Sequence, residues 1–425
     1  MTRGRLRVAG ELTVPGDKSI SHRSLICSAL AEGTSQVRSI LQSADVHSTA
    51  GVLRALGVDV PELSESMTIT GVGLRGLQTP SVNLDCGNSG TSTRLLAGVV
   101  AGSRISGRFV GDASLSGRPM RRIARPLTEM GATVELPEHG GLPMTVHGAE
   151  LRDIEWNNET GSAQVKSCIM FAGLCAGVEA KVSEPTRSRD HTERMLAAQG
   201  ADVWVNEEAV LLHPVHKLAP LDVTIPGDPS SAAFFAALAA LAPAGELLLR
   251  RVCVNETRIG FLAALREMGA SVELENRERL AGEWVADVRV VAGAALAGVS
   301  IGREAIPTLI DELPLVACLA AYASGETRVT GAEELRVKES DRIAVVVNNL
   351  RSLGADAEEL PDGYVVRGTS PVLRGTVTTH GDHRMALAFG ILAALPGNEI
   401  TIDDRACVAV SYPGFWSDLA RVATS

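Results

Sequence analysis

Basic side chains in this sequence gather in short segments that also contain Gly, Ser or Thr. The first segment holds Lys18, Ser19 and Arg23, and the arginine follows the lysine by five residues. Arginine matches carboxylate and phosphate oxygens with two parallel hydrogen bonds, whereas lysine acts as a movable point charge. Similar segments recur along the chain at Asn88–Arg94, Arg118, Ser162–Lys166, Lys338–Arg342 and Gly381–Arg384. This clustering predicts the binding of small polyanions.

Acidic residues accompany these cations. Glu339 lies between Lys338 and Arg342, and Asp311 and Glu312 open an otherwise apolar helix. A carboxylate beside two cations favours its ionised form, which suits a general base. Each carboxylate could instead cap a helix or lie on the surface, and for Glu312 that is the preferred interpretation.

The elements that must position these side chains repeat about every 70 residues. A helix end, a Gly, a small residue and an apolar strand recur at Gly57, Gly131, Gly200, Gly269 and Gly354. Glycine suits the left-handed conformation that ends a helix. Upstream of each, a turn leads into an apolar, Ala-rich helix, and a sixth unit ends the chain. Pro15-Gly16-Asp17 returns half a chain later as Pro226-Gly227-Asp228, which predicts two similar halves of three units.

The cationic segments coincide with the openings of these helices. The first N–H groups of a helix are unpaired and carry partial positive charge, so helix openings are natural anion sites. The chain as a whole carries a net charge of −10 and has 3% aromatic residues. Such a chain repels nucleic acid and anionic membranes at long range, and it has few rings for stacking on bases. We therefore expect neither as a partner.

Other spacings indicate a reduced, cytoplasmic protein without a bound metal. The seven cysteines form no C-x-x-C pair, and no H-E-x-x-H or paired Cys–His ligand set occurs. Glu11 interrupts the apolar stretch that a signal peptide would need. The longest apolar stretches, 232–242 and 313–323, are shorter than the ~20 residues of a membrane span. We expect no metal and no cofactor.

Six motifs in order resemble the 5-enolpyruvylshikimate-3-phosphate (EPSP) synthase family. They lie between about Pro15 and Pro413 and read PGDKSISHRS, GNSGTSTRLL, SLSGRPM, SAQVKS, LRVKESDR and GDHRMA. The resemblance implies an α/β (α+β) fold of two similar domains, each of three βαβαββ units. This is the inside-out α/β barrel of enolpyruvyl transferases, with the active site in the interdomain cleft. In the family the first strand joins the second domain, so the expected domains are residues 1–17 with 228–425, and 18–227.

The resemblance also implies a reaction. The 5-hydroxyl of shikimate 3-phosphate attacks phosphoenolpyruvate, and elimination of phosphate leaves the enolpyruvyl (carboxyvinyl) group on the sugar-like acid. The step belongs to the shikimate pathway to chorismate and the aromatic amino acids. Two anions must be held in contact, which needs a dense set of cations and an acid/base group on each side.

Roles follow from the resemblance by motif. The shikimate 3-phosphate side is implied for Lys18, Ser19, Arg23, Ser162, Ala163 and Gln164, with Lys18 also touching phosphoenolpyruvate. The phosphoenolpyruvate side is implied for Gly90, Arg118, Arg342 and Arg384. Asp311 resembles the group that takes the hydroxyl proton, Glu339 the group that handles the methylene proton, and Lys338 lies beside the intermediate. The implied catalytic residues are Asp311, Glu339 and Lys18.

Three positions depart from the best-known bacterial pattern. Ala163 stands where a second serine is common, and Lys166 is a candidate to replace its phosphate contact. Arg189 lies in the segment where many members have a tyrosine, and Val410 stands where many have a lysine. The segments SAQVK, RDHTE and NETR resemble the second bacterial class, which is often tolerant of the inhibitor glyphosate. Gly90 would favour glyphosate binding, so tolerance is a hypothesis.

Two alternatives remain open at this stage. The sister transferase that acts on UDP-N-acetylglucosamine usually carries a reactive Cys in the loop that corresponds to Gly111–Met120, and this loop has none. A non-catalytic sensor of phosphorylated metabolites would need the cations but not Asp311 and Glu339. The expected partners are therefore shikimate 3-phosphate and phosphoenolpyruvate, with glyphosate as a possible inhibitor. A monomer that closes on shikimate 3-phosphate is expected.

Overall fold

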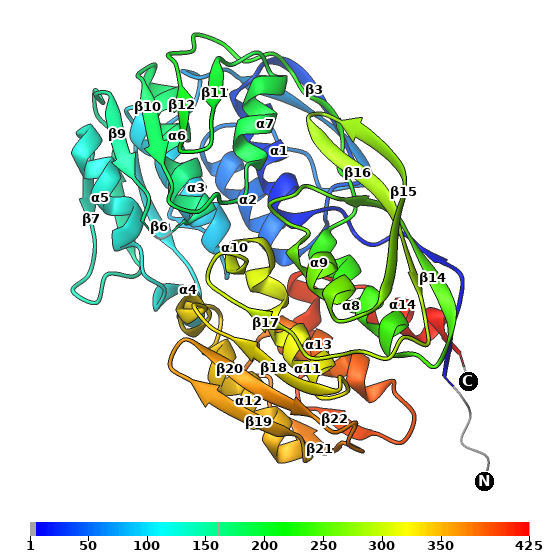
Figure 1. Cartoon of the computed structure of the whole chain (residues 1–425). Helices are drawn as coiled ribbons and strands as arrows, with labels where there is room; N and C mark the ends of the chain where they lie inside the picture. Colours follow the sequence, from blue (N-terminus) through cyan, green and yellow to red (C-terminus); the bar gives the residue numbers. More distant parts are fainter. Residues whose placement is uncertain (1–5, 160, 425) are drawn as a thin grey trace. The chain divides into compact units, whose positions relative to one another are not determined.

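The computed structural model describes residues 6–159 and 161–424 (Figure 1). Its chain forms two compact units. The first, here the Lys18 unit, comprises Gly16–Ile225 and the short segment Arg279–Glu283. The second, here the Arg342 unit, combines the chain up to Pro15 with Pro226–Glu278 and the residues from Trp284 onward. Each unit is described by itself below.

The Lys18 unit contains three sheets of related topology. In the first, β3 (Glu32–Arg38) pairs in parallel with β13 (Asp222–Thr224) and antiparallel with β4 (Ser66–Val72). The second has the order β5-β6-β8-β7 and is formed by Leu84–Asp85, Ser106–Val110, Met144–His147 and Thr133–Glu135. The third has the order β9-β10-β12-β11 and is formed by Ile154–Asn157, Ala180–Ser183, Ala209–Leu212 and Val203–Val205. In the last two sheets the first pair is parallel and the other pairs are antiparallel.

Three helices of the Lys18 unit are buried on almost every side. They are α1 (Lys18–Leu30), α3 (Gly90–Gly102) and α6 (Ala163–Ala176). α3 and α6 are largely apolar, as interior helices are, whereas the polar side chains of α1, such as His22 and Arg23, are buried with hydrogen-bond partners. The remaining helices are α2 (Ala44–Ala55), α4 (Ala113–Ser116), α5 (Arg121–Met130) and α7 (His191–Ala198).

The Arg342 unit repeats the same plan. One sheet has the order β15-β16-β14-β1-β23, with β2 also on β14, from Ser271–Leu280, Glu283–Val291, Ala244–Cys253, Arg7–Val8, Ala423–Thr424 and Glu11–Leu12. A second has the order β17-β18-β20-β19, from Ser300–Ile301, Gly325–Val329, Gly363–Gly368 and Asp356–Leu360. A third pairs β21 (Arg374–Val377) with β22 (Glu399–Ile402) in parallel. The turn between β15 and β16 is the segment assigned to the Lys18 unit.

Three buried helices again form the interior of the Arg342 unit. They are α8 (Pro229–Leu241), α11 (Leu313–Ala320) and α13 (His383–Ala393), which contact one another. The other helices are α9 (Gly260–Glu267), α10 (Ile306–Leu309), α12 (Arg342–Leu353), α14 (Phe415–Val422) and the short 3-10 turns η1 (Ile310–Glu312), η2 (Glu333–Val337) and η3 (Ala406–Val410). Most of the core is Ala, Leu, Val and Ile, and five rings at 234, 235, 412, 415 and 416 form its aromatic cluster.

The predicted repeats and the mixed α/β fold are confirmed. All five repeat glycines have positive φ, from +86° at Gly200 to +115° at Gly131, as helix-ending residues in the left-handed region should. One local expectation was wrong: the strand after Gly57 does not follow at once but begins at Ser66. All seven cysteines are buried. No helix within the described ranges combines the length and hydropathy that a membrane crossing requires.

Candidate active site

The first helix of the Lys18 unit begins at its candidate lysine. Asp17 caps α1 by accepting a hydrogen bond from the N–H of Ile20 at 2.8 Å. Lys18 therefore lies in the first turn, and its Nζ forms an ion pair with Asp45 Oδ2 of α2 at 3.0 Å. The cap and the ion pair together orient the ammonium group. Asp45 had been assigned no role, and its 27-residue separation from Lys18 gave no signal.

Arg23 is almost completely buried and is held by oxygens of neutral groups. Its Nε donates to Thr192 Oγ1 at 2.7 Å, Nη2 to Ser167 Oγ at 2.8 Å and Nη1 to the backbone oxygen of Ser19 at 3.0 Å. Burial lowers the pKa of Arg23 to about 10. Arg23 remains charged at neutral pH, and its position is fixed by three elements of the same unit, α1, α6 and α7.

Gln164 and Gly90 meet at a side chain that sequence reasoning left without a role. Arg94 Nη1 donates to Gln164 Oε1 at 2.5 Å, and Gln164 Nε2 donates to Thr91 Oγ1 at 3.0 Å. A Cβ added at Gly90 would lie 2.8 Å from Arg94 Nη1. Arg94 lies one helical turn after Gly90, so the motif contained the signal that the two are neighbours.

Arg118 follows the short helix α4 and is buried. Its Nη2 donates to Asn88 Oδ1 at 2.7 Å and lies 3.3 Å from Ser114 Oγ. Asn88 in turn donates to Asp112 Oδ2 at 2.7 Å. The loop that precedes α3 and the loop that carries Arg118 are thus tied together, so the candidate residues Gly90 and Arg118 belong to one cluster.

The expectation that Lys166 replaces the missing serine contact of Ala163 was wrong. Ser162 and Ala163 lie at the opening of α6 and are half-buried, but Lys166 lies one turn further inside with a side chain 1% exposed. Its Nζ lies 2.8 Å from Glu184 Oε2 and 2.7 Å from Glu193 Oε1. Burial alone would lower the pKa of Lys166, but the two carboxylates outweigh it and raise that pKa. The ammonium group of Lys166 therefore forms a buried ion triad with Glu184 and Glu193.

In the Arg342 unit one guanidinium organises three carboxylates. Arg342 Nε lies 2.8 Å from Asp382 Oδ2, Nη2 lies 2.5 Å from Glu339 Oε2 and Nη1 lies 3.3 Å from Asp311 Oδ1. The residue is 1% exposed. Burial opposes its charge, but the three carboxylates outweigh burial and raise the pKa of Arg342. The two predicted proton-transfer groups thus share one arginine.

Arg384 lies beside this cluster at the start of α13. Asp382 caps the helix and accepts a hydrogen bond from the Arg384 N–H at 3.0 Å. The side-chain Nη1 donates to the backbone oxygen of Asp311 at 3.0 Å and to Glu312 Oε1 at 3.3 Å. Its Nη2 lies 3.6 Å from Asp311 Oδ2. The arginine is therefore held by two consecutive residues of η1.

Lys338 directly follows η2 and is half-buried. Burial lowers the pKa of its ammonium group, with Asp311 opposing that effect and Arg342 adding to it. Asp311, Lys338, Glu339, Arg342 and Arg384 form one electrostatic cluster in this unit.

Glu312 occupies the N-cap position of α11, as one expectation had it, but its side chain makes no capping hydrogen bond, and the alternative of a surface charge was wrong. The residue is 2% exposed and pairs with Arg384. Burial raises its pKa above the ordinary value, with Arg384 opposing that effect and Asp311 adding to it. The sequence offered no signal beyond the acidic pair itself, because the partner arginine lies 72 residues further along the chain.

Arg189 and Val410 are the other two positions that depart from the best-known bacterial pattern. Arg189 is half-buried and close enough to Arg23 to lower the pKa of that side chain. Val410 is half-buried at the end of η3. Arg189 can therefore add positive charge beside Arg23, whereas Val410 adds none.

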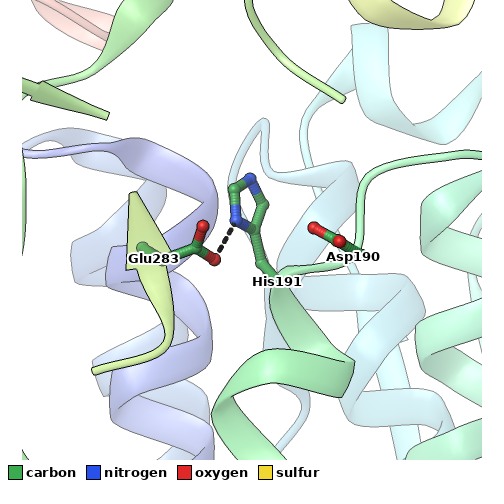
Figure 2. Close-up of side chains that lie close together, drawn as sticks. All are labelled: Asp190, His191 and Glu283. Atoms are coloured by element: carbon green, nitrogen blue, oxygen red, sulfur yellow. Dashed lines mark hydrogen bonds and ion pairs between the residues drawn. The ribbon is translucent and has the colours of Figure 1, made fainter. Parts of the chain in front are cut away.

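A buried group with metal-ligand chemistry lies at the start of α7, which the sequence did not predict. Asp190, His191 and Glu283 lie together, and His191 Nδ1 is 2.7 Å from Glu283 Oε1 (Figure 2). Arg194 also lies here, 2.8 Å from Asp190 Oδ2 and 3.9 Å from Glu283 Oε2. A divalent cation would have to share both carboxylates with that guanidinium. The group fits an ion-pair cluster that holds the β15–β16 turn better than it fits a metal centre.

The nucleotide-type spacing at Gly71–Gly76, G-x-G-x-x-G, also lacks the required context. It spans the end of β4 and the turn after it, and it leads into irregular chain rather than a helix. A dinucleotide site needs a helix N-terminus at that point.

The chain has the fold of the enolpyruvyl transferases. The solved enolpyruvyl transferase NikO from Streptomyces tendae has a TM-score of 0.77 with 18% identity, covering 99% of this chain and 98% of that one, which shows the shared fold. The profile of the family described as EPSP synthase (3-phosphoshikimate 1-carboxyvinyltransferase) matches residues 2–419. The chain belongs to the EPSP synthase family.

Relatives of known name support that membership. A protein named 3-phosphoshikimate 1-carboxyvinyltransferase from Persephonella marina is 47% identical over 423 residues, which is 99% of this chain and 98% of that protein. One of the same name from Xanthomonas euvesicatoria pv. vesicatoria is 47% identical over 408 residues, which is 96% of this chain and 92% of that protein. The solved EPSP synthase from Acinetobacter baumannii has a TM-score of 0.88 with 40% identity, covering 99% and 97% of the two chains.

Proposed function

We propose that this chain is a 3-phosphoshikimate 1-carboxyvinyltransferase that moves the enolpyruvyl group of phosphoenolpyruvate to the 5-hydroxyl of shikimate 3-phosphate. Family membership over nearly the whole chain supports the reaction. The observation that carries the proposal is the pairing of Asp311 and Glu339 with one buried arginine, Arg342. A protein that only binds phosphorylated metabolites needs cations, but it does not need two carboxylates held ready for proton transfer.

The proposed mechanism uses the two carboxylates in turn. Asp311 accepts the proton of the 5-hydroxyl as that oxygen bonds to the middle carbon of phosphoenolpyruvate, while Glu339 delivers a proton to the methylene carbon. The resulting tetrahedral intermediate then loses the methyl proton to Glu339. Cleavage of the carbon–oxygen bond releases phosphate, which leaves with its electron pair and takes up a proton. The sum is one enol ether and one inorganic phosphate.

The cations hold the two anions for this chemistry. Lys18, Ser19, Arg23, Ser162, Ala163 and Gln164 are assigned to shikimate 3-phosphate. Gly90, Arg118, Arg342 and Arg384 are assigned to phosphoenolpyruvate, with Lys18 touching both substrates and Lys338 beside the intermediate. Helix N-termini support these assignments, because α1, α3, α6 and α13 open at or beside residues of both sets.

The organisation of the protein is part of the proposal. We assign the two domains to residues 1–17 with 228–425 and to residues 18–227, and we propose that the enzyme acts as a cytoplasmic monomer. Sedimentation at several concentrations measures the oligomeric state, and a concentration-dependent increase in mass would contradict a monomer.

A phosphate-release assay tests the function directly. We expect phosphate release with phosphoenolpyruvate and shikimate 3-phosphate together, and none when UDP-N-acetylglucosamine replaces the acceptor. Lys18→Met and Glu339→Ala should each abolish turnover. Binding of both substrates without phosphate release would contradict the proposal, and full activity in either variant would contradict the residue roles.

A further inference from the structure

Glu312 is a buried acid that the proposed mechanism does not use. It lies between η1 and α11, directly after Asp311, and its Oε1 is 3.3 Å from Arg384 Nη1. The same Nη1 donates to the Asp311 backbone oxygen at 3.0 Å. The Asp311 carbonyl and the Glu312 carboxylate therefore both accept a hydrogen bond from the same nitrogen of Arg384.

A second buried arginine, Arg258, influences Glu312 electrostatically. Arg258 Nη2 donates to Ser230 Oγ at 3.0 Å and lies 3.3 Å from Asp228 Oδ1. Arg258 and the Ser230 hydroxyl both lower the pKa of Glu312. Glu312 therefore pairs directly with Arg384 and lies within the electrostatic influence of Arg258.

The position costs the fold something, which points away from a purely structural role. Desolvation is the largest influence on Glu312 and raises the pKa of its carboxyl group. Removing the charge would leave the buried guanidinium of Arg384 without its carboxylate partner, so Glu312→Gln should be less stable than wild type. An acid in such a place is better explained by what its charge does to Arg384.

We propose that Glu312 is a positioning residue that fixes the guanidinium of Arg384 for phosphoenolpyruvate and ties it to the backbone of Asp311. This inference rests on the proposed function, in which Arg384 belongs to the phosphoenolpyruvate side. Glu312 acts through Arg384 and does not itself touch substrate. Removing the Glu312 side chain should weaken the binding of phosphoenolpyruvate and leave the binding of shikimate 3-phosphate unaffected.

Steady-state kinetics of two variants measure this split. Hydrogen bonds to charged groups are among the stronger ones in proteins, and Glu312→Ala removes one from Arg384. This variant should therefore raise KM for phosphoenolpyruvate about 10- to 100-fold. KM for shikimate 3-phosphate should stay within about threefold of wild type, since only Arg384 loses a partner. Glu312→Gln keeps the shape and one acceptor but loses the charge, so its rise should be smaller, at about three- to tenfold.

The matched control is Glu275→Gln in the same unit. It also removes a carboxylate from an arginine, Arg289, whose Nε lies 2.6 Å from Glu275 Oε1, and neither residue has an assigned role in the reaction. This control should leave both KM values unchanged. Thermal unfolding at pH 7 reports the loss of stability separately: Glu312→Gln should unfold at a lower temperature than wild type, yet only its KM for phosphoenolpyruvate should rise.

The outcomes separate the inference from the function on which it rests. Absence of phosphate release in wild type contradicts the proposed function. Wild-type turnover combined with a KM for phosphoenolpyruvate within twofold in both Glu312 variants overturns the role of Glu312 alone. A rise of both KM values in parallel also overturns it, because that pattern is one of general damage. If Glu312→Ala fails to fold, Glu312→Gln decides the question.

Discussion

The hydrogen bonds described above for the candidate arginines differ between the two units. In the Lys18 unit, Arg23, Arg94 and Arg118 donate to hydroxyl, amide and carbonyl oxygens. In the Arg342 unit, Arg342 and Arg384 donate to carboxylates and, for Arg384, also to a carbonyl. A guanidinium that donates to neutral oxygens keeps more of its positive charge for a ligand than one that is compensated by carboxylates.

Under the proposed function, this difference corresponds to two kinds of role. The Lys18 unit would supply positive charge to hold anions, and the Arg342 unit would supply the proton-transfer carboxylates as well as two further arginines for phosphoenolpyruvate. Carboxylates also pair with cations in the Lys18 unit, where Asp45 pairs with Lys18 and Glu184 and Glu193 pair with Lys166. Changes to the two kinds of arginine should nevertheless have different kinetic signatures.

The largest expected effect comes from Arg342→Lys. A single ammonium cannot hold three carboxylates in the geometry of a guanidinium, so Asp311 and Glu339 lose their positions. We expect kcat to fall about 10²–10⁴-fold, the range of general acid–base catalysis, and the free energy of unfolding to fall by about 3–5 kcal/mol. Steady-state kinetics and urea unfolding measure both.

Arg118→Lys is the matched change in the other unit. It should raise KM for phosphoenolpyruvate about tenfold or more while kcat and the free energy of unfolding stay close to wild type. Equal losses of kcat in Arg342→Lys and Arg118→Lys would remove the distinction between the units.

Lys166→Met tests the buried ion triad of the Lys18 unit. Removal of the ammonium leaves Glu184 and Glu193 buried without compensation, so the free energy of unfolding should fall by about 3–5 kcal/mol. Urea unfolding measures the loss, and the added changes Glu184→Gln and Glu193→Gln should recover part of it. A higher KM for shikimate 3-phosphate with unchanged stability would restore Lys166 as a phosphate ligand.

Glu283→Gln tests whether carboxylate pairing also fixes the β15–β16 turn. Burial alone would raise the pKa of Glu283, but His191 and Arg194 outweigh it and hold that pKa below its ordinary value. A lowered pKa in the folded state stabilises the fold above the unfolded pKa of about 4.3, and the stabilisation is lost as pH falls through the folded pKa. The variant should be less stable by about 1–3 kcal/mol at pH 7, and the gap should close below about pH 4.

The control for that pH dependence is Glu278→Gln. Glu278 lies on β15 of the same hairpin, and its exposed carboxylate pairs with Arg251 of β14. The change should therefore lower the free energy of unfolding by less than about 1 kcal/mol. A stability gap for Glu283→Gln that does not vary with pH would show that the contact is not an ion pair.

The smallest effect is expected from Gly90→Ala. The new Cβ would lie 2.8 Å from Arg94 Nη1 and 3.5 Å from Arg118 Nη1, so Arg94 and its partner Gln164 must shift. We expect KM for phosphoenolpyruvate to rise about tenfold, equivalent to about 1.4 kcal/mol, and glyphosate to inhibit less well. Inhibition measured against phosphoenolpyruvate also tests tolerance of the unmodified enzyme, and tight competitive inhibition would rule it out.

The sequence predicted the repeats and the positions of the candidate residues better than their partners. A helix end followed by Gly131 or Gly354 involves only residues that are neighbours in the sequence, so the pattern can be recognised without the structure. The pairing of Arg94 with Gln164, of Lys166 with Glu193 and of Glu312 with Arg384 depends on how buried helices pack. That packing brings together residues up to 72 positions apart, and their separation in the sequence follows no regular spacing from which the pairs could be predicted.

Single-turnover rates at saturating substrates test the two kinds of role most directly, with Asp311→Asn and Arg118→Lys compared against wild type. We expect that Asp311→Asn binds shikimate 3-phosphate normally but reacts about 10²–10⁴-fold more slowly, whereas Arg118→Lys regains a near wild-type rate once phosphoenolpyruvate saturates. A near wild-type rate in Asp311→Asn, or a slow rate in saturated Arg118→Lys, would contradict these roles.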